Sequence, residues 1–267
     1  MEWIETLRDL AGYRPGDFLM FSPRTYWRLF EQHNAAWWPW GLLWPVLALA
    51  AAVWLARGGL VAQRATALAL AAASVFVAQV FVLGLYEPIN WAARGLAWLW
   101  WVLAAALVLQ PFALSLSKCR FERGLRQPQP EREVVRAWAS TSSARTGSLI
   151  LLAWALFGHP LLALLAGRPL AQAEVAGLAP DPTAIVVLAW LVQVPRPQQP
   201  LRVNRAGLAL RAAAALAYGL AWGAAVTLCL AAAATLATMG EPQAAAMLVA
   251  PIAAVIARFH SRRPSPA

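Results

Sequence analysis

Six polar residues beside the apolar segments of this chain carry side chains that commonly bind ligands. Ionisable groups are costly to place near a lipid bilayer, so those that occur there often mark a functional site. The six come from three separate parts of the sequence, and we predict that they line one outer-leaflet cavity. They are Glu87, Asn90, Arg94, His159, Asp181 and Thr183.

His159 lies within the apolar stretch LFGHPLLALL and is followed by Pro160. Because proline frees a backbone carbonyl one turn earlier, the imidazole can either bind a ligand or hydrogen-bond that carbonyl. The other histidines, His33 and His260, fall at an expected membrane interface and in the C-terminal tail. A haem with two axial histidines and a three-ligand zinc or copper site therefore lack ligands. We expect no metal and no cofactor.

The stretch GLYEPINWAAR has a second interpretation, a capped turn between two membrane helices. Pro88 can end the first helix, and Asn90 can cap the second. Arg94 lies one turn further on, where its side chain can pair with Glu87. Asp181 stands between two prolines in GLAPDPTAIVV, at the start of another apolar segment. From the sequence, the turn and the cavity rim both remain open.

Catalysis and ion-coupled transport find little support in the sequence. No Asp or Glu falls in the middle of an apolar segment, where a coupled transporter usually holds a carboxylate. The sequence also lacks a G-x-S-x-G elbow, a cysteine with a histidine base and a phosphate-binding glycine loop. We expect a non-catalytic ligand- or partner-binding module, or an accessory membrane subunit. The alternatives are a permease for a small uncharged solute and, more weakly, an enzyme acting on lipid headgroups through Glu87, His159 and Asp181.

The composition indicates a membrane protein. Of 267 residues, 61% are hydrophobic and 13% are charged, whereas an average soluble domain has roughly 25% charged residues. The apolar residues form runs of the length needed to cross a hydrocarbon core of about 30 Å. We predict an all-α polytopic bundle of seven membrane helices in a single domain, residues 38–259, with the fifth and seventh helices short for a full crossing. The helices are expected at 38–56, 66–86, 91–114, 146–167, 182–194, 208–237 and 243–259.

The distribution of charge favours one orientation in the membrane. Sixteen of the 22 Lys and Arg residues lie on the side of the basic loop 115–145 and the tail 260–267, and nine of the 12 acidic residues lie on the other. By the positive-inside rule, the N-terminal segment 1–37 is outside and the C-terminus is cytoplasmic, in the cell (inner) membrane. We expect no cleavable signal peptide at the start of the chain. We expect the lipid bilayer and a homo-oligomer or larger membrane complex as partners, and no nucleic acid, because the basic residues are spread among loops.

Residues 22–37 are typical of an amphipathic helix that lies on the outer membrane surface before the first crossing. Ser22 is a good N-cap and Pro23 fits the first helical position. One face of this helix carries Tyr26, Leu29, Phe30 and His33, which recur at helical spacing. Aromatic residues favour the membrane interface. Those expected there are Tyr26, Trp37, Trp38 and Trp40.

Several of these stretches resemble a family of bacterial multi-pass membrane proteins known as a domain of unknown function. They follow one another in the family's order over most of the chain: FSPRTYWRLFEQHNAAWWP, LYEPINWAA, GLAPDPTAIVV, AWGAAVTLCL and GEPQ. The resemblance implies a helical membrane domain and supplies no reaction. The family pattern has a cysteine between the prolines of GLAPDPTAIVV, where this chain has Asp181.

Overall fold

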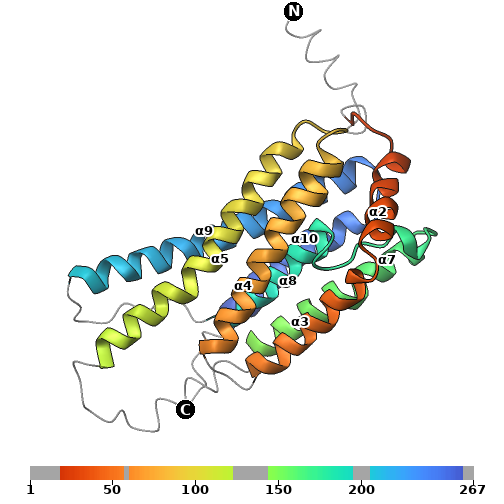
Figure 1. The fold of residues 1–267 in the computed structure, drawn as a ribbon. Helices are drawn as coiled ribbons and strands as arrows, with labels where there is room; N and C mark the ends of the chain where they lie inside the picture. Colours follow the sequence, from red (N-terminus) through yellow and green to blue (C-terminus); the bar gives the residue numbers. More distant parts are fainter. Residues whose placement is uncertain (1–18, 57–59, 123–143, 195–204, 261–267) are drawn as a thin grey trace, which may run out of the picture.

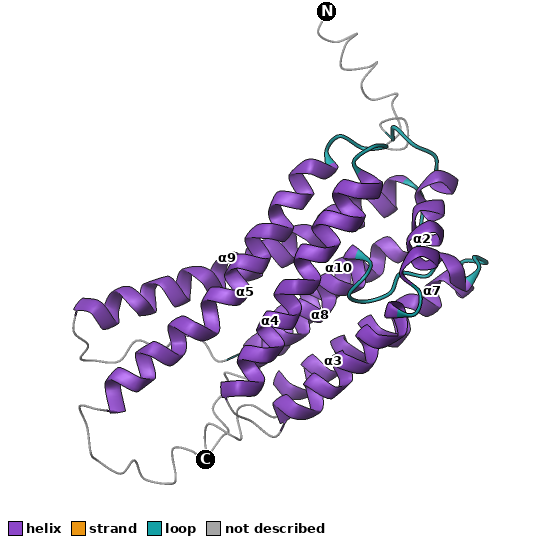
Figure 2. Ribbon diagram, viewed as in Figure 1, coloured by secondary structure: helices purple, strands orange, loops and turns teal. Residues whose placement is uncertain are grey.

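The computed structural model describes residues 19–56, 60–122, 144–194 and 205–260, and every regular element within these ranges is a helix (Figure 2). Most of the predicted basic loop, much of segment 1–37 and nearly all of the tail fall outside the described residues. Figure 1 shows the helices running side by side in an elongated bundle. The elements are α2 (Pro23–Trp37), α3 (Trp40–Ala56), α4 (Leu60–Phe76), η2 (Val77–Tyr86), α5 (Ala93–Glu122), the segment Ala144–Leu165 that ends in η3 (Trp154–Gly158) and α7 (His159–Leu165), η4 (Leu170–Gln172), α8 (Pro180–Gln193), α9 (Arg205–Thr238) and α10 (Gln243–His260).

Each predicted apolar segment is helical, but the described helices differ in length. Four are long and apolar enough to cross a membrane: Val61–Tyr86, Ala93–Gln110, Ala144–Leu165 and Ala212–Thr238. A fifth candidate combines α2 and α3, which are bent by 83° relative to each other. With 14 residues, α8 extends only about 21 Å at 1.5 Å per residue. The fold is therefore all-helical with four or five candidate spans, and seven crossings remain a prediction.

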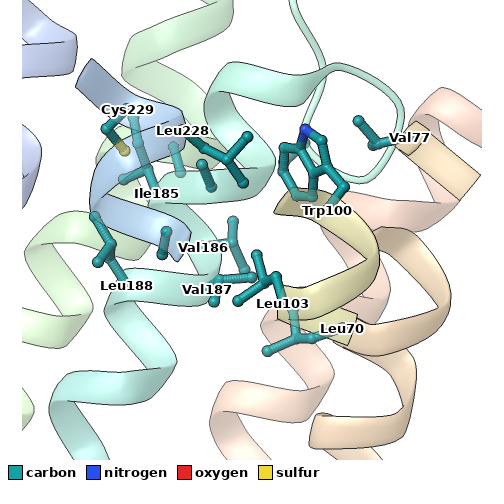
Figure 3. Close-up of a cluster of buried hydrophobic side chains, with 14 of the residues drawn as sticks. Leu70, Val77, Trp100, Leu103, Ile185, Val186, Val187, Leu188, Leu228 and Cys229 are labelled. Atoms are coloured by element: carbon teal, nitrogen blue, oxygen red, sulfur yellow. The ribbon is translucent and has the colours of Figure 1, made fainter. Parts of the chain in front are cut away.

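The short helix α8 forms the centre of the bundle, where it packs against α9 and α10. Ile185, Leu188 and Leu191 of α8 are completely buried. Figure 3 shows Ile185 and Leu188 in a cluster with Leu228 and Cys229 of α9. On the outside of the bundle, in contrast, many large apolar side chains are exposed. They include Phe157, Leu216 and Val249, as expected for surfaces that face lipid.

Helix α2 begins as the sequence predicts. The Ser22 hydroxyl accepts a hydrogen bond from the Thr25 amide at 3.2 Å, and Pro23 is the first helical residue. The predicted apolar face is buried, whereas Arg24, Arg28, Glu31 and Gln32 are exposed. Of the four residues expected at the interface, Trp38 and Trp40 are exposed, Trp37 is half-buried and Tyr26 is buried among aromatic rings of α2 and η2.

Candidate functional site

Three buried ionisable side chains meet at one end of α8, and we call them the buried triad. They are His159 of α7, Glu174 of the connection between η4 and α8, and Asp181 of the first turn of α8. They are 1%, 2% and 3% exposed. One nitrogen or oxygen of each lies within 4.8 Å of those of the other two. The His159 Nδ1 atom is 3.4 Å from Glu174 Oε2, which is longer than a normal hydrogen bond of about 2.7–3.2 Å.

A widened helix leads up to His159. Residues Trp154–Gly158 form η3, a turn with π-type hydrogen bonding, and α7 begins at His159. Such turns often occur at functional sites because the extra residue re-aims the side chains that follow. A Cβ atom at Gly158 would lie 2.4 Å from Trp154 Cε3, so only glycine fits beside this indole. The Trp154–Gly158 contact thus fixes the turn immediately before the imidazole.

The connection from α7 to α8 folds back against the bundle and carries Glu174 inward. It starts with a Schellman motif, in which Gly167 adopts a φ of 71° and the Arg168 amide donates to the Ala163 carbonyl at 2.8 Å. The Asn34 side chain of α2 then donates to the carbonyls of Ala171 and Ala173, at 2.8 Å each. These bonds hold the backbone next to Glu174.

Asp181 is positioned by the start of α8. Ala179 is the N-cap and Pro180 the first helical residue, a position that proline suits. The Thr183 hydroxyl donates to the Ala179 carbonyl at 2.5 Å and accepts from the Gly177 amide at 2.7 Å. Thr183 therefore ties the connection to the first turn of α8. The helix N-terminus also favours a negative charge at Asp181.

Burial sets the electrostatics of the two carboxyl groups. It raises the pKa of Glu174 well above the usual value, and the nearby Asp181 carboxyl raises it further. Arg168 supplies a compensating positive charge that opposes the rise in the pKa of Glu174, and its guanidinium carbon lies 3.3 Å from the centre of the Trp27 ring. Trp27 in turn donates its Nε1–H to Glu241 at 2.8 Å, which completes a layer of charged and aromatic groups beside the triad.

The polar atoms of the triad are left largely without protein partners. Within the described part of the chain, no hydrogen bond reaches His159 Nδ1 or Nε2, either carboxylate oxygen of Glu174, or Asp181 Oδ2. Buried side-chain groups of this kind are nearly always hydrogen-bonded in folded proteins. The triad can therefore accept a cation or several hydrogen-bond donors, and this is the chemistry the arrangement offers.

Two cavities with shared lining residues lie near the surface and beside Asp181, respectively. The first, of about 210 Å³, is lined by the exposed Met20 and by Asn90, Tyr86 and Thr235. The second, of about 30 Å³, shares Tyr86 and Thr235 with the first and is also lined by Tyr26 and Asp181. We call them the mouth cavity and the inner cavity. Both lie toward the end of the bundle that carries the connections 87–92 and 239–242, called here the turn end.

The six residues predicted to line one cavity separate into four groups. His159 and Asp181 come together in the buried triad, and Asn90 lines the mouth cavity, where its Nδ2 donates to the Tyr86 hydroxyl at 2.7 Å. Glu87 and Arg94 instead form an ion pair at the surface, as the capped-turn interpretation predicts. Thr183 makes the local hydrogen bonds described above. Glu87, His159 and Asp181 therefore do not form the acid–base set considered for a lipid enzyme.

Glu174 is the residue that the sequence analysis missed. It lies outside every predicted helix, so counting carboxylates in the middle of apolar segments passed over it. The signal present was a single carboxylate in the otherwise uncharged stretch AQAEVAGLAP, between His159 and Asp181. With Glu174 included, the chain does bring three potential metal ligands together. The argument that too few ligands exist for a metal site therefore no longer holds.

Comparisons of the chain with protein-family models, with curated proteins and with solved structures found no match.

Proposed function

We propose that this chain is a seven-helix protein of the bacterial inner membrane that binds a small cation in the buried triad on its outer side, as a non-catalytic module or accessory subunit. The observation that carries the proposal is the set of unpartnered polar atoms on His159, Glu174 and Asp181. Burying unpaired charge destabilises a folded protein by several kcal/mol per ion. A bound cation neutralises the two carboxylates and satisfies their lone pairs.

The sidedness follows from the positive-inside rule, which assigns the turn end to the outside. The mouth cavity opens at that end, so the ligand enters from outside the cytoplasm. Helices α8 and α10 complete the count of seven, since short segments can sit in a locally thinned bilayer.

Binding is favoured over conduction by what lies beyond the triad along α8. The next turns of this helix bury Ile185, Leu188 and Leu191 in an apolar core. A separate cavity of about 80 Å³ follows α8 beside α3 and α4, but none of the triad residues lines it. A permease needs a polar path between the two faces, and the described residues provide one only on the turn-end side.

The test replaces each carboxylate by its amide in the purified, detergent-solubilised protein, with a chelator and no added ligand. Glu174→Gln and Asp181→Asn each replace a buried carboxyl group by a neutral amide, which can donate to the remaining carboxylate. We expect each variant to be more stable than the wild type by about 1–3 kcal/mol, the usual penalty of an unpaired buried polar group. Thermal unfolding followed by intrinsic tryptophan fluorescence measures this difference.

Glu87→Gln is the matched control, because Glu87 is a surface carboxylate paired with Arg94. Such pairs contribute roughly 0–1 kcal/mol, so this variant should lose little stability. If Glu174→Gln and Asp181→Asn are both less stable than the wild type, the carboxylates support the fold and the proposed function is wrong.

A further inference from the structure

The proposed cation site has the features of a metal site, and these narrow the class of ligand. The inner cavity beside Asp181 has a volume of about 30 Å³. This is comparable with the share of one water molecule in the liquid, whereas pockets for organic ligands run from about 300 to 1,000 Å³. The space beside Asp181 is therefore of a size that suits a bare or partly hydrated ion better than an organic ligand.

The spacing of His159 and Glu174 matches metal coordination better than hydrogen bonding. With bonds of about 2.1 Å to a central ion, neighbouring ligand atoms of a tetrahedral site lie about 3.4 Å apart. The distance from His159 Nδ1 to Glu174 Oε2 is 3.4 Å. The triad atoms lie within 4.8 Å of one another, so side-chain shifts on the order of 1 Å would bring all of them to bonding distance.

The types of donor atom select among ions. Sodium, magnesium and calcium are held mainly by oxygen atoms, whereas an imidazole nitrogen combined with carboxylates suits divalent transition metals. Two carboxylates balance the charge of a divalent ion. The positive charge of Arg168 also interacts electrostatically with Glu174. Three protein ligands also leave coordination positions for water or for another molecule.

Resting on the proposed function, we propose that His159, Glu174 and Asp181 bind a divalent transition-metal ion, such as Zn²⁺ or Mn²⁺, that enters through the mouth and inner cavities. An access route is a necessary feature of a buried metal site. Here the two cavities share Tyr86 and Thr235 and end at Asp181. Asn90 and the Tyr86 hydroxyl place polar atoms along this route.

The test measures Zn²⁺ binding to the purified full-length chain, with any affinity tag removed and bound metal stripped by a chelator. Equilibrium dialysis followed by elemental analysis gives the stoichiometry, and the absorption spectrum of the Co²⁺ form reports the donor atoms and their geometry. We expect one ion per chain and a Co²⁺ spectrum of nitrogen and oxygen ligation. The variants His159→Gln, Glu174→Gln and Asp181→Asn should each bind Zn²⁺ at least about 100-fold more weakly, because removing a ligand exceeds the 10- to 100-fold effect of outer-shell changes.

Two controls separate the triad from other groups that bind metal. Glu87→Gln changes a surface carboxylate, and His33→Gln changes a buried histidine of α2 that is not part of the triad. Both should bind Zn²⁺ as the wild type does. Equal binding by the wild type and all three triad variants, or no binding by the wild type, overturns the metal assignment.

The two proposals fail in different ways. If Glu174→Gln is more stable than the wild type but the wild type binds neither Zn²⁺ nor Mn²⁺, the metal assignment is wrong and the cation-site proposal stands. If the triad amides also destabilise the protein, both proposals are wrong. Because the amide variants are expected to fold at least as well as the wild type, loss of binding cannot be attributed to misfolding.

Discussion

Replacing Gly177 by alanine tests how the connection that carries Glu174 is held against the bundle. Gly177 has a φ of 87°, a backbone conformation that side chains other than glycine rarely adopt. A Cβ atom there would lie 2.5 Å from Cγ of Trp44 and 2.7 Å from its Cδ2. The Gly177 amide also donates to the Thr183 hydroxyl, so a shift of this residue disturbs the start of α8.

The expected loss of stability has two parts. The unfavourable φ costs about 1–3 kcal/mol. Overpacking against Trp44 adds about 1–3 kcal/mol, because the indole must move or the backbone must retreat. Gly177→Ala should therefore destabilise the protein by about 2–6 kcal/mol and should also weaken Zn²⁺ binding, since Glu174 and Asp181 flank the disturbed segment.

Gly167→Ala is the matched control, because Gly167 has a φ of 71° and its Cβ would meet no atom within 4 Å. It should carry only the backbone part of the loss. Thermal unfolding of both variants, with and without Trp44→Ala, separates the steric part as a coupling energy of about 1–3 kcal/mol. If Gly177→Ala costs no more than Gly167→Ala, the contact with Trp44 does not hold this connection in place.

Two further changes probe the support of the site and its access route. Asn34→Asp removes both hydrogen bonds to the carbonyls of Ala171 and Ala173. We expect this variant to lose about 1–3 kcal/mol of stability and to bind Zn²⁺ more weakly in equilibrium dialysis. Gln32→Glu, on the exposed face of the same helix, should change neither the stability nor the Zn²⁺ binding. An unchanged Asn34→Asp variant would show that α2 does not position Glu174. Thr235→Leu fills the junction of the mouth and inner cavities, so Zn²⁺ uptake in a stopped-flow chelator competition should slow severalfold at unchanged stoichiometry. Thr227→Leu, at an exposed position of α9, is its control, and equal uptake rates in the two variants would place the access route elsewhere.

Much of the fold follows directly from the pattern of the sequence. Long apolar runs become helices because a chain in an apolar environment must satisfy its backbone hydrogen bonds internally. The N-terminus of α2 was predictable because Ser22 and Pro23 are strong local signals. Which segments cross fully was not predictable, since the central position of α8 depends on contacts with α9 and α10 that no local pattern encodes.

The site was predicted only in part, for a physical reason. His159 and Asp181 stood out because each is an ionisable residue next to a proline, within or at the start of an apolar segment. Glu174 lies in a connection, and connections usually run over the surface, where a carboxylate is ordinary. Its burial depends on the Schellman turn at Gly167 and on the hydrogen bonds from Asn34, which are tertiary features. Glu87 is predicted as part of the site because its position at the end of an apolar segment does not distinguish a surface ion pair from a buried carboxylate.

The most direct test of the account compares the unfolding temperature of the wild type and Glu174→Gln, each with a chelator and with saturating Zn²⁺. The account predicts a crossing: Glu174→Gln is the more stable protein without metal, and the wild type is the more stable protein with Zn²⁺, because a ligand that binds only the folded state stabilises it. If Glu174→Gln is the less stable protein in both conditions, or if Zn²⁺ raises both unfolding temperatures equally, the buried triad is not a metal site.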